Sequence, residues 1–326
     1  MDSYEQVRFF TLENEIPLVA QPVKAGIKLS DWIRSNKMLI DDKLEKCGAI
    51  LFRGFDVPDQ QAFTEVVWAV SSKLLTYTYS STPRTQVGDR IYTATEYPAN
   101  QTIPLHNESS YQRSWPLRLI FYCLQPAEAG GETPLADSVK VTNRIDPAVK
   151  RKFLERDVMY VRNYEPGMDL SWQTVFQTSD KAEVERFCSD NGIQYEWITK
   201  DSLRTRQVCQ SMAQHWTRGE KIWFNQAHLF HISSLDERTR RALLLIYREE
   251  DLPRNSYYGD GSRIETDALE VIRAAYRAET VSFTWKATDV LLLDNMLVCH
   301  GRTPFKGKRK VLAAMTDEYR VNSMAQ

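Results

Sequence analysis

The chain has 326 residues, 42% of them hydrophobic, and its 42 basic and 43 acidic residues leave a formal net charge of -1. This balance draws the protein to neither a phosphate backbone nor an anionic membrane, so we expect no nucleic-acid and no membrane partner. The five cysteines are scattered without a C-x-x-C pair, which is typical of a reducing compartment. The N-terminus MDSYEQVRFF lacks an apolar signal region. We therefore expect a cytoplasmic protein.

The first predicted strand is GAILFRGF (48–55), a short apolar run bounded by glycines. A helix is expected to follow it, from Asp59 to about Leu75. The segment RLIFYCL (118–124) is rich in aromatic and branched residues and predicts a second strand. The first half of the chain therefore combines strands with few helices.

The last third predicts one helix and two strands. Residues 267–279 carry apolar side chains at helical spacing, whereas 281–285 and 289–294 return to strand character. Strands and helices do not alternate regularly, which favours a mostly antiparallel β core with helices packed outside it. Because no linker or repeat divides the chain, we expect a single domain over residues 1–326.

The segment IPLHNESSY (103–111) carries a candidate metal site. On an extended chain His106 and Glu108 project to the same side, so an imidazole and a carboxylate can meet one ion. The pair does not close a site, and a third ligand must come from elsewhere. A polar loop without a metal is the alternative interpretation.

His300 is the first candidate for that third ligand, because it ends the apolar run VLLLDNMLVCH. A histidine buried in the core for structural reasons is the alternative. The residues after it suggest an anionic cosubstrate, since they include a cluster of cations: Arg302, Lys306, Lys308, Arg309 and Lys310. His228 and His231 form an H-x-x-H pair without the glutamate of an H-E-x-x-H helix, so we interpret both as structural.

Six segments in the same order resemble the iron(II)/2-oxoglutarate oxygenases of the taurine dioxygenase (TauD/TfdA) superfamily. They are GAILFRGF, TEYPANQTIPLHNESSY, PAEAGGETPLADS, IWFNQAHLFHISSL, YYGDGSRIE and DNMLVCHGRTPFKGKRKVLAAM. Within the superfamily the chain is most similar to the branch of nonribosomal-peptide biosynthesis typified by the syringomycin aspartyl hydroxylase. The resemblance implies a double-stranded β-helix core, also called a jelly roll or cupin-like fold.

The resemblance also implies the metal ligands. His106, Glu108 and His300 would form a facial triad on Fe(II), leaving positions for 2-oxoglutarate and O2. Related halogenases carry a small residue in place of the carboxylate. Glu108 therefore favours hydroxylation, desaturation or cyclisation.

Two further residues would hold the distal C5 carboxylate of 2-oxoglutarate. Arg309 offers a planar fork of donors for a carboxylate, and Thr133 resembles a family threonine that contacts the same group. Lys310 is the rival to Arg309, because a slip of one residue in a strand exchanges the two faces.

Substrate contacts are predicted from the same resemblance. Glu96 and Gln101 precede the triad segment in a region that lines the family's substrate pocket, and Asn225 would line the opposite wall. Some relatives carry a second arginine where this chain has Ala313. Recognition of a substrate carboxylate would then fall to Arg118 or Arg302.

The predicted function is that of a dioxygenase that oxidises an unactivated C–H bond, by hydroxylation as the default, and releases succinate and CO2. The expected substrate is an amino acid or a peptide-derived natural-product intermediate, free or tethered to a carrier protein. The alternatives are a desaturase or cyclase with the same iron chemistry, a non-catalytic metal- or small-molecule-binding protein of this fold, and a zinc hydrolase with the same three ligands.

Overall fold

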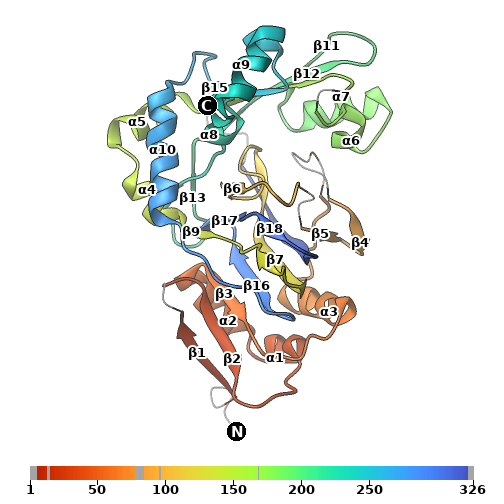
Figure 1. Ribbon diagram of the computed structural model, residues 1–326, viewed down its shortest axis with the longest axis vertical. Coiled ribbons are helices and arrows are strands. Elements are labelled where there is room, and N and C mark those ends of the chain that lie inside the picture. Colours follow the sequence, from red (N-terminus) through yellow and green to blue (C-terminus); the bar gives the residue numbers. More distant parts are fainter. Residues whose placement is uncertain are drawn as a thin grey trace.

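The computed structural model describes residues 6–12, 15–77, 79, 84–94, 97–167 and 169–321. Its largest element is an eight-stranded sheet (Figure 1). In spatial order its strands are β1 (Val7–Thr11), β2 (Leu18–Pro22), β3 (Ala49–Phe52), β16 (Val290–Asp294), β7 (Ser114–Gln125), β19 (Lys310–Arg320), β5 (Ile91–Thr93) and β4 (Gln86–Gly88). Its strand pairs are antiparallel except β2 with β3.

Strand β16 shows why the middle of this sheet is apolar throughout. All five of its residues are buried, because side chains on alternate positions enter two different cores. Val290 and Leu292 pack with the N-terminal helices on one face. Leu291 and Leu293 pack on the other face in the same core as Val298 of the next strand.

Two short sheets lie over that second face. One has three strands in the order β6 (Ile103–His106), β17 (Val298–Arg302) and β9 (Leu135–Asp137). The other pairs β18 (Phe305–Lys306) with β8 (Ala129–Gly130). In the first of them, β17 is central and places His300 opposite both His106 of β6 and Leu135 of β9.

The chain between β9 and β16 builds a separate region at the upper end of the molecule in Figure 1. Its four-stranded sheet has the order β11 (Gln194–Trp197), β12 (Leu203–Cys209), β10 (Val158–Tyr164) and β15 (Arg254–Tyr258). A hairpin of β13 (Met212–Gln214) and β14 (Lys221–Trp223) follows β12. The core of this region contains Leu105 and Cys299, so it packs directly on the strands β6 and β17.

The helices lie outside the sheets. Those near the N-terminus are α1 (Leu29–Ser35), α2 (Lys37–Cys47) and α3 (Gln60–Val70). Those between β9 and β16 are α4 (Ser138–Arg144), α5 (Pro147–Arg156), α6 (Trp172–Phe176), α7 (Lys181–Asp190), α8 (Ala227–Phe230), α9 (Glu237–Ile246) and α10 (Thr266–Glu279), with the 3-10 turns η2 (Ile232–Ser234) and η3 (Glu249–Asp251). Among the described residues, no helix has the length and apolar character needed to cross a membrane.

The structure confirms a β core that is mostly antiparallel, with helices outside. The strand predicted at 48–55 is β3, that at 118–124 lies within β7, that at 289–294 is β16, and the helix at 267–279 is α10.

One predicted boundary and one predicted strand were wrong. Helix α3 ends at Val70 rather than near Leu75, because Ser71 is extended. Of the strand predicted at 281–285, only Val281 pairs, in an isolated bridge with Leu135. The aromatic rings of Phe283 and Trp285 stack edge to face in the core instead, so burial rather than strand pairing explains this apolar segment.

Candidate active site

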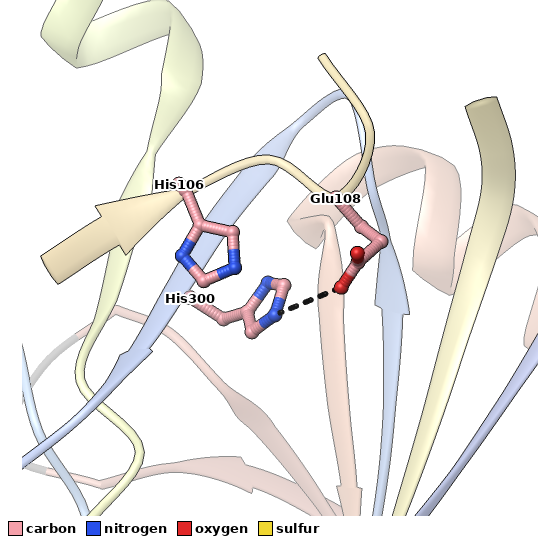
Figure 2. Close-up of side chains that lie close together, drawn as sticks. All are labelled: His106, Glu108 and His300. Carbon is pink, nitrogen blue, oxygen red and sulfur yellow. Dashed lines mark ion pairs between the residues drawn. The ribbon is translucent and has the colours of Figure 1, made fainter. Parts of the chain in front are cut away.

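The three predicted metal ligands converge from two segments that are far apart in sequence. His106 is the last residue of β6, and His300 lies in the middle of β17. Glu108 does not lie on an extended strand as expected, because a turn begins at that residue. The turn nevertheless brings its carboxylate back toward the two imidazoles (Figure 2).

The distances are those of side chains that can share one ion. One ligand atom from each of His106, Glu108 and His300 lies within 4.8 Å of the other two. The Nε2 atom of His300 is 4.0 Å from Oε2 of Glu108, and the centroids of the two imidazoles are 4.5 Å apart. Among the described residues, this is the one group of three or more such side chains with that spacing.

The donor set fits a metal ion. The Nδ1–H of His106 donates to the carbonyl of Pro104 at 2.8 Å, which fixes the tautomer and leaves Nε2 free as a ligand. Burial lowers the pKa of His106 and brings that of His300 well below its ordinary value, so both imidazoles are neutral. The Nδ1 atom of His300 is buried, and no described residue forms a hydrogen bond with it. Neutral imidazoles beside a carboxylate are the ligands that a divalent iron prefers.

Gly301 permits the close approach of the two ligand strands. A Cβ atom at this position would lie 2.6 Å from the carbonyl oxygen of Ile103 on β6. Any larger residue would therefore push β17 away from β6 and separate His300 from His106.

A cavity beside the triad contains the predicted cosubstrate residues. It is lined by Arg84, Ala94, Ile103, His106, Phe121, Thr133, His300, Gly301, Arg302, Arg309 and Val311. The predicted pair, Arg309 and Thr133, thus shares one cavity with two of the three metal ligands. Lys310 is exposed and is not part of this lining.

The backbone of Gly131 holds the side chain of Arg309 at the cavity wall. Its Nε donates to the carbonyl of Gly131 at 3.0 Å. Gly131 has a positive φ of 74°, and a Cβ there would come within 3.0 Å of the Arg309 side chain, so glycine is required both for the turn and for the passage of the arginine. Burial, followed by the nearby charge of Arg302, lowers the pKa of Arg309 to about 10, which leaves it charged at neutral pH.

Thr133 is oriented by a residue that sequence reasoning missed. The indole Nε1 of Trp285 donates to Thr133 Oγ1 at 3.0 Å. With that acceptor site occupied, the hydroxyl proton of Thr133 is available to donate to another group. The only sequence signal was an aromatic residue in a segment predicted as a strand.

A second group missed by sequence reasoning holds the triad backbone. Oδ1 of Asn295 accepts from the N–H of Glu108 at 2.7 Å, and its Nδ2 donates to the Glu108 carbonyl at 3.0 Å. Nδ2 of Asn107 donates to the Asn295 carbonyl at 2.6 Å. These bonds connect the turn that carries Glu108 to the turn that precedes the strand of His300.

Cys299 faces away from the cavity, as predicted from strand alternation. Its Sγ lies 3.3 Å from Oδ1 of Asn107 and 3.3 Å from Oγ of Ser138. Burial raises the pKa of this thiol to about 12, so it is a protonated structural group.

Arg84 is the third feature absent from the predictions. Its Nη2 donates to Oε2 of Glu108 at 2.6 Å, with both side chains almost fully buried. The guanidinium also lies over the ring of Tyr77, 4.4 Å from its centroid. Burial alone would lower the pKa of Arg84, but the charge of Glu108 raises it above its ordinary value. A permanent cation therefore lies beside the proposed carboxylate ligand.

Of the three predicted substrate residues, the structure describes Gln101 and Asn225, and these two do not gather at the cavity. Glu96 lies outside the described residues. The side chain of Gln101 is exposed, and that of Asn225 donates to the carbonyl of Ser211 and accepts from the N–H of Ala227. Neither residue lines the cavity. The geometry lends these predicted contacts no support.

The two arginines considered for a substrate carboxylate already have partners. Arg302 donates to the backbone carbonyls of residues 97, 98 and 101, which ties the loop before β6 to β17. Arg118 pairs with Asp41 of α2 at 3.0 Å.

His228 and His231 behave as structural residues. His228 is buried and stacks on Tyr276 with ring centroids 4.6 Å apart. Nδ1 of His231 accepts from the N–H of Ser233 at 3.1 Å and so caps η2. The two side chains do not join a third ligand among the described residues.

Comparison with known proteins shows the family of the chain. The model of the family described as taurine catabolism dioxygenase TauD, TfdA family matches residues 14–316. The chain is 42% identical over 278 residues to the dapdiamide synthesis protein DdaC of Enterobacter agglomerans, covering 85% of this chain and 84% of DdaC. It is 31% identical over 319 residues to a clavaminate synthase-like protein of Arabidopsis thaliana, covering 92% of this chain and 93% of the relative.

Solved structures share the fold at low sequence identity. PvcB from Pseudomonas aeruginosa superposes with a TM-score of 0.57 at 13% identity, over 96% of this chain and 92% of PvcB. The enzyme AAD-2, solved with Mn(II) and N-oxalylglycine, gives a TM-score of 0.52 at 14% identity, over 95% of this chain and 96% of AAD-2.

The fold and the site define a non-haem oxygenase. The chain belongs to the TauD/TfdA family and is a 2-oxoglutarate-dependent dioxygenase.

Proposed function

We propose that this dioxygenase hydroxylates an unactivated C–H bond of an amino acid or a peptide-derived natural-product intermediate. The convergence of His106, Glu108 and His300 within 4.8 Å, beside a cavity that also contains Arg309, supports this proposal more than any other observation. A substrate tethered to a carrier protein and a free substrate are both compatible with it.

His106, Glu108 and His300 would hold the iron through two neutral imidazoles and one carboxylate. An iron held by these residues, together with 2-oxoglutarate and O2, would supply an oxidant strong enough to attack a C–H bond, with succinate and CO2 as the coproducts. Phe121 packs against His300 with ring centroids 5.1 Å apart, which keeps this imidazole in a defined orientation and excludes water from one side.

Arg309 and Thr133 would bind the C5 carboxylate of 2-oxoglutarate. Nε of Arg309 is already bonded to Gly131, so the terminal nitrogens are the donors left for a ligand. Thr133 adds a hydroxyl donor oriented by Trp285. Because Lys310 points to solvent, Arg309 is the better candidate of the two cations.

The choice of substrate class rests on the relatives. DdaC is a dapdiamide synthesis protein, and PvcB is described as an Fe, alpha-ketoglutarate dependent oxygenase from an isonitrile synthetic pathway. Both names point to natural-product biosynthesis. Retention of Glu108 favours hydroxylation, desaturation or cyclisation over halogenation, and hydroxylation is the default outcome among the three.

We extend the proposal to the fold. The eight-stranded sheet and the short sheets that carry the ligands would form the two walls of a double-stranded β-helix, with the metal at the mouth between them. Since the family match spans residues 14–316, we propose one oxygenase domain.

The test is anaerobic addition of Fe(II) and 2-oxoglutarate to the purified protein. Wild type should develop a weak metal-to-ligand charge-transfer band in the visible, and His300→Ala should not. Admission of air should then yield succinate. A band without succinate would support a non-catalytic binding protein, and activity with Zn(II) alone would support a hydrolase.

A further inference from the structure

Arg84 has more hydrogen-bonding capacity than the site described so far uses. Its side chain is 2% exposed and lines the cavity. One terminal nitrogen donates to Glu108, whereas the buried Nε has no hydrogen-bond partner among the residues that the structure describes. An unpaired N–H of a buried guanidinium costs free energy. A ligand that accepts this hydrogen bond would therefore be favoured.

The stacking contact keeps Arg84 at this place. The ring of Tyr77 lies under the guanidinium, and Tyr77 is itself buried. A planar cation on an aromatic face has fewer ways to rearrange than an exposed side chain. The stacking thus restricts the orientation of the Arg84 side chain, which lines the cavity.

The positive charge of the cavity lining favours the binding of a second anionic group besides 2-oxoglutarate. Three arginines are among its lining residues, Arg84, Arg302 and Arg309, and the described lining contains no carboxylate. Arg302 directs both terminal nitrogens to backbone carbonyls, although its buried Nε has no partner among the described residues. Arg309 is assigned to 2-oxoglutarate. The negative charge of the Glu108 carboxylate now balances the positive charge of Arg84. A metal ion bound to Glu108 would neutralise that carboxylate and leave Arg84 without a counter-charge.

We propose that Arg84 binds a carboxylate of the substrate, and therefore that the substrate is a free acid at that end. This inference rests on the function proposed above and narrows its substrate class. It gives to Arg84 the role for which the sequence had suggested Arg118 or Arg302. Some relatives carry a second arginine where this chain has Ala313. Arg84 would take the place of that arginine in recognising an acid.

The experiment compares acids with their amides. The probes are the proteinogenic L-amino acids and their N-acetyl derivatives, each paired with its carboxamide. Binding to the anaerobic Fe(II)–2-oxoglutarate enzyme is followed by the perturbation of the visible band, and succinate release is measured in air. A charge-assisted hydrogen bond predicts that at least one acid binds about 10- to 100-fold more tightly than its amide.

Variants assign that preference to Arg84. Arg84→Met should bring the ratio of acid to amide affinity close to one, and Arg84→Lys should restore part of it, because the charge remains but the fork is lost. Arg84→Gln replaces Arg84→Met if circular dichroism shows that the latter does not fold. Arg118→Met is the matched control, since this arginine pairs with Asp41 and lies outside the cavity lining, and it should keep the wild-type ratio.

Three results would overturn the inference while leaving the proposed function intact. One is a wild-type enzyme that binds no acid more tightly than its amide. Another is an Arg84→Met enzyme whose affinity for 2-oxoglutarate falls about tenfold or more with the ratio preserved, because Arg84 would then bind the C1 carboxylate of the cosubstrate. The third is weaker metal binding with the ratio preserved, which would restrict Arg84 to orienting Glu108. A wild type without the visible band would instead reject the oxygenase function itself.

Discussion

Asn295 holds the backbone of Glu108 through both of its side-chain atoms, accepting from its N–H at 2.7 Å and donating to its carbonyl at 3.0 Å. Asn295 is fully buried and directly follows Asp294, the last residue of β16. The same turn leads to the strand of His300. One side chain therefore fixes the spacing between the two halves of the triad.

Replacement of Asn295 by alanine should weaken metal binding. The variant loses the two bonds to Glu108 and a third to the carbonyl of Pro116, at about 1 kcal/mol each. Outer-sphere partners of metal ligands typically change affinity by about 10- to 100-fold. We expect a decrease in that range for Mn(II), measured by isothermal titration calorimetry. Asn225→Ala removes an equally buried asparagine that bonds to Ser211 and Ala227. If both variants lose affinity equally, the effect is one of general stability.

The two adjacent cations after the triad should differ sharply in their effect on 2-oxoglutarate. Arg309→Met removes the cation in the cavity and should raise the Kd for 2-oxoglutarate by about 10- to 100-fold, equivalent to about 1.5–3 kcal/mol. Lys310→Met changes an exposed side chain and should leave this Kd within about twofold. Both values come from anaerobic titration of the visible band. The opposite order would mean that the strand register assigned to β19 is wrong.

Some residues of the site could be predicted from the sequence, and others could not. His106, Glu108, His300, Thr133 and Arg309 belong to segments whose order and spacing are characteristic of the family. The structure brings the first three together, and four of the five, all but Glu108, line one cavity. Strand alternation also placed Cys299 on the far side correctly.

The supporting residues follow no such pattern. Arg84 precedes β4 in a stretch of sequence without apolar periodicity, so its approach to Glu108 depends on tertiary structure that no local pattern encodes. Asn295 resembles any turn residue in sequence, because its function arises from backbone groups nearly two hundred positions away. Trp285 was assigned to a strand for its aromatic character, although burial is the reason for that character.

Removal of Arg84 should destabilise the metal-free protein more than the metal-bound one. In Arg84→Met the buried Glu108 carboxylate loses its counter-charge, and breaking such a pair costs about 3–5 kcal/mol. Mn(II) supplies a new counter-charge. The increase in Tm on adding Mn(II) should therefore be larger for Arg84→Met than for wild type, measured by differential scanning calorimetry.

The control for that experiment is Arg118→Met. Its pair with Asp41 is partly exposed, and such pairs contribute about 0–1 kcal/mol. Its stability and its response to Mn(II) should both stay near those of wild type. An equal response of Arg84→Met and wild type to Mn(II) would contradict a direct electrostatic role of Arg84 at Glu108.

His228 should make the protein less stable in mild acid. Burial, with the nearby charge of Arg273, lowers the pKa of His228 to about 3, whereas an unfolded histidine titrates near 6.5. Below about pH 6.5 the unfolded chain therefore binds a proton that the folded one does not, so the free energy of unfolding falls as the pH falls. One such group contributes about 1.4 kcal/mol per pH unit in this range.

His228→Gln should remove the contribution of this one titrating group to the pH dependence of the free energy of unfolding. Urea unfolding of the metal-free protein at about pH 7.5 and about pH 5 gives the slope for each protein, and the slope of the variant should be smaller by about 1 kcal/mol per pH unit. At about pH 7.5 the imidazole is neutral in both states, so the difference between the proteins there measures the contacts of the neutral ring, which include its stacking on Tyr276 and its hydrogen bond with the backbone of Leu105. Equal slopes for the two proteins would show that His228 is accessible to protons in the folded state, and that its stacking on Tyr276 does not exclude water.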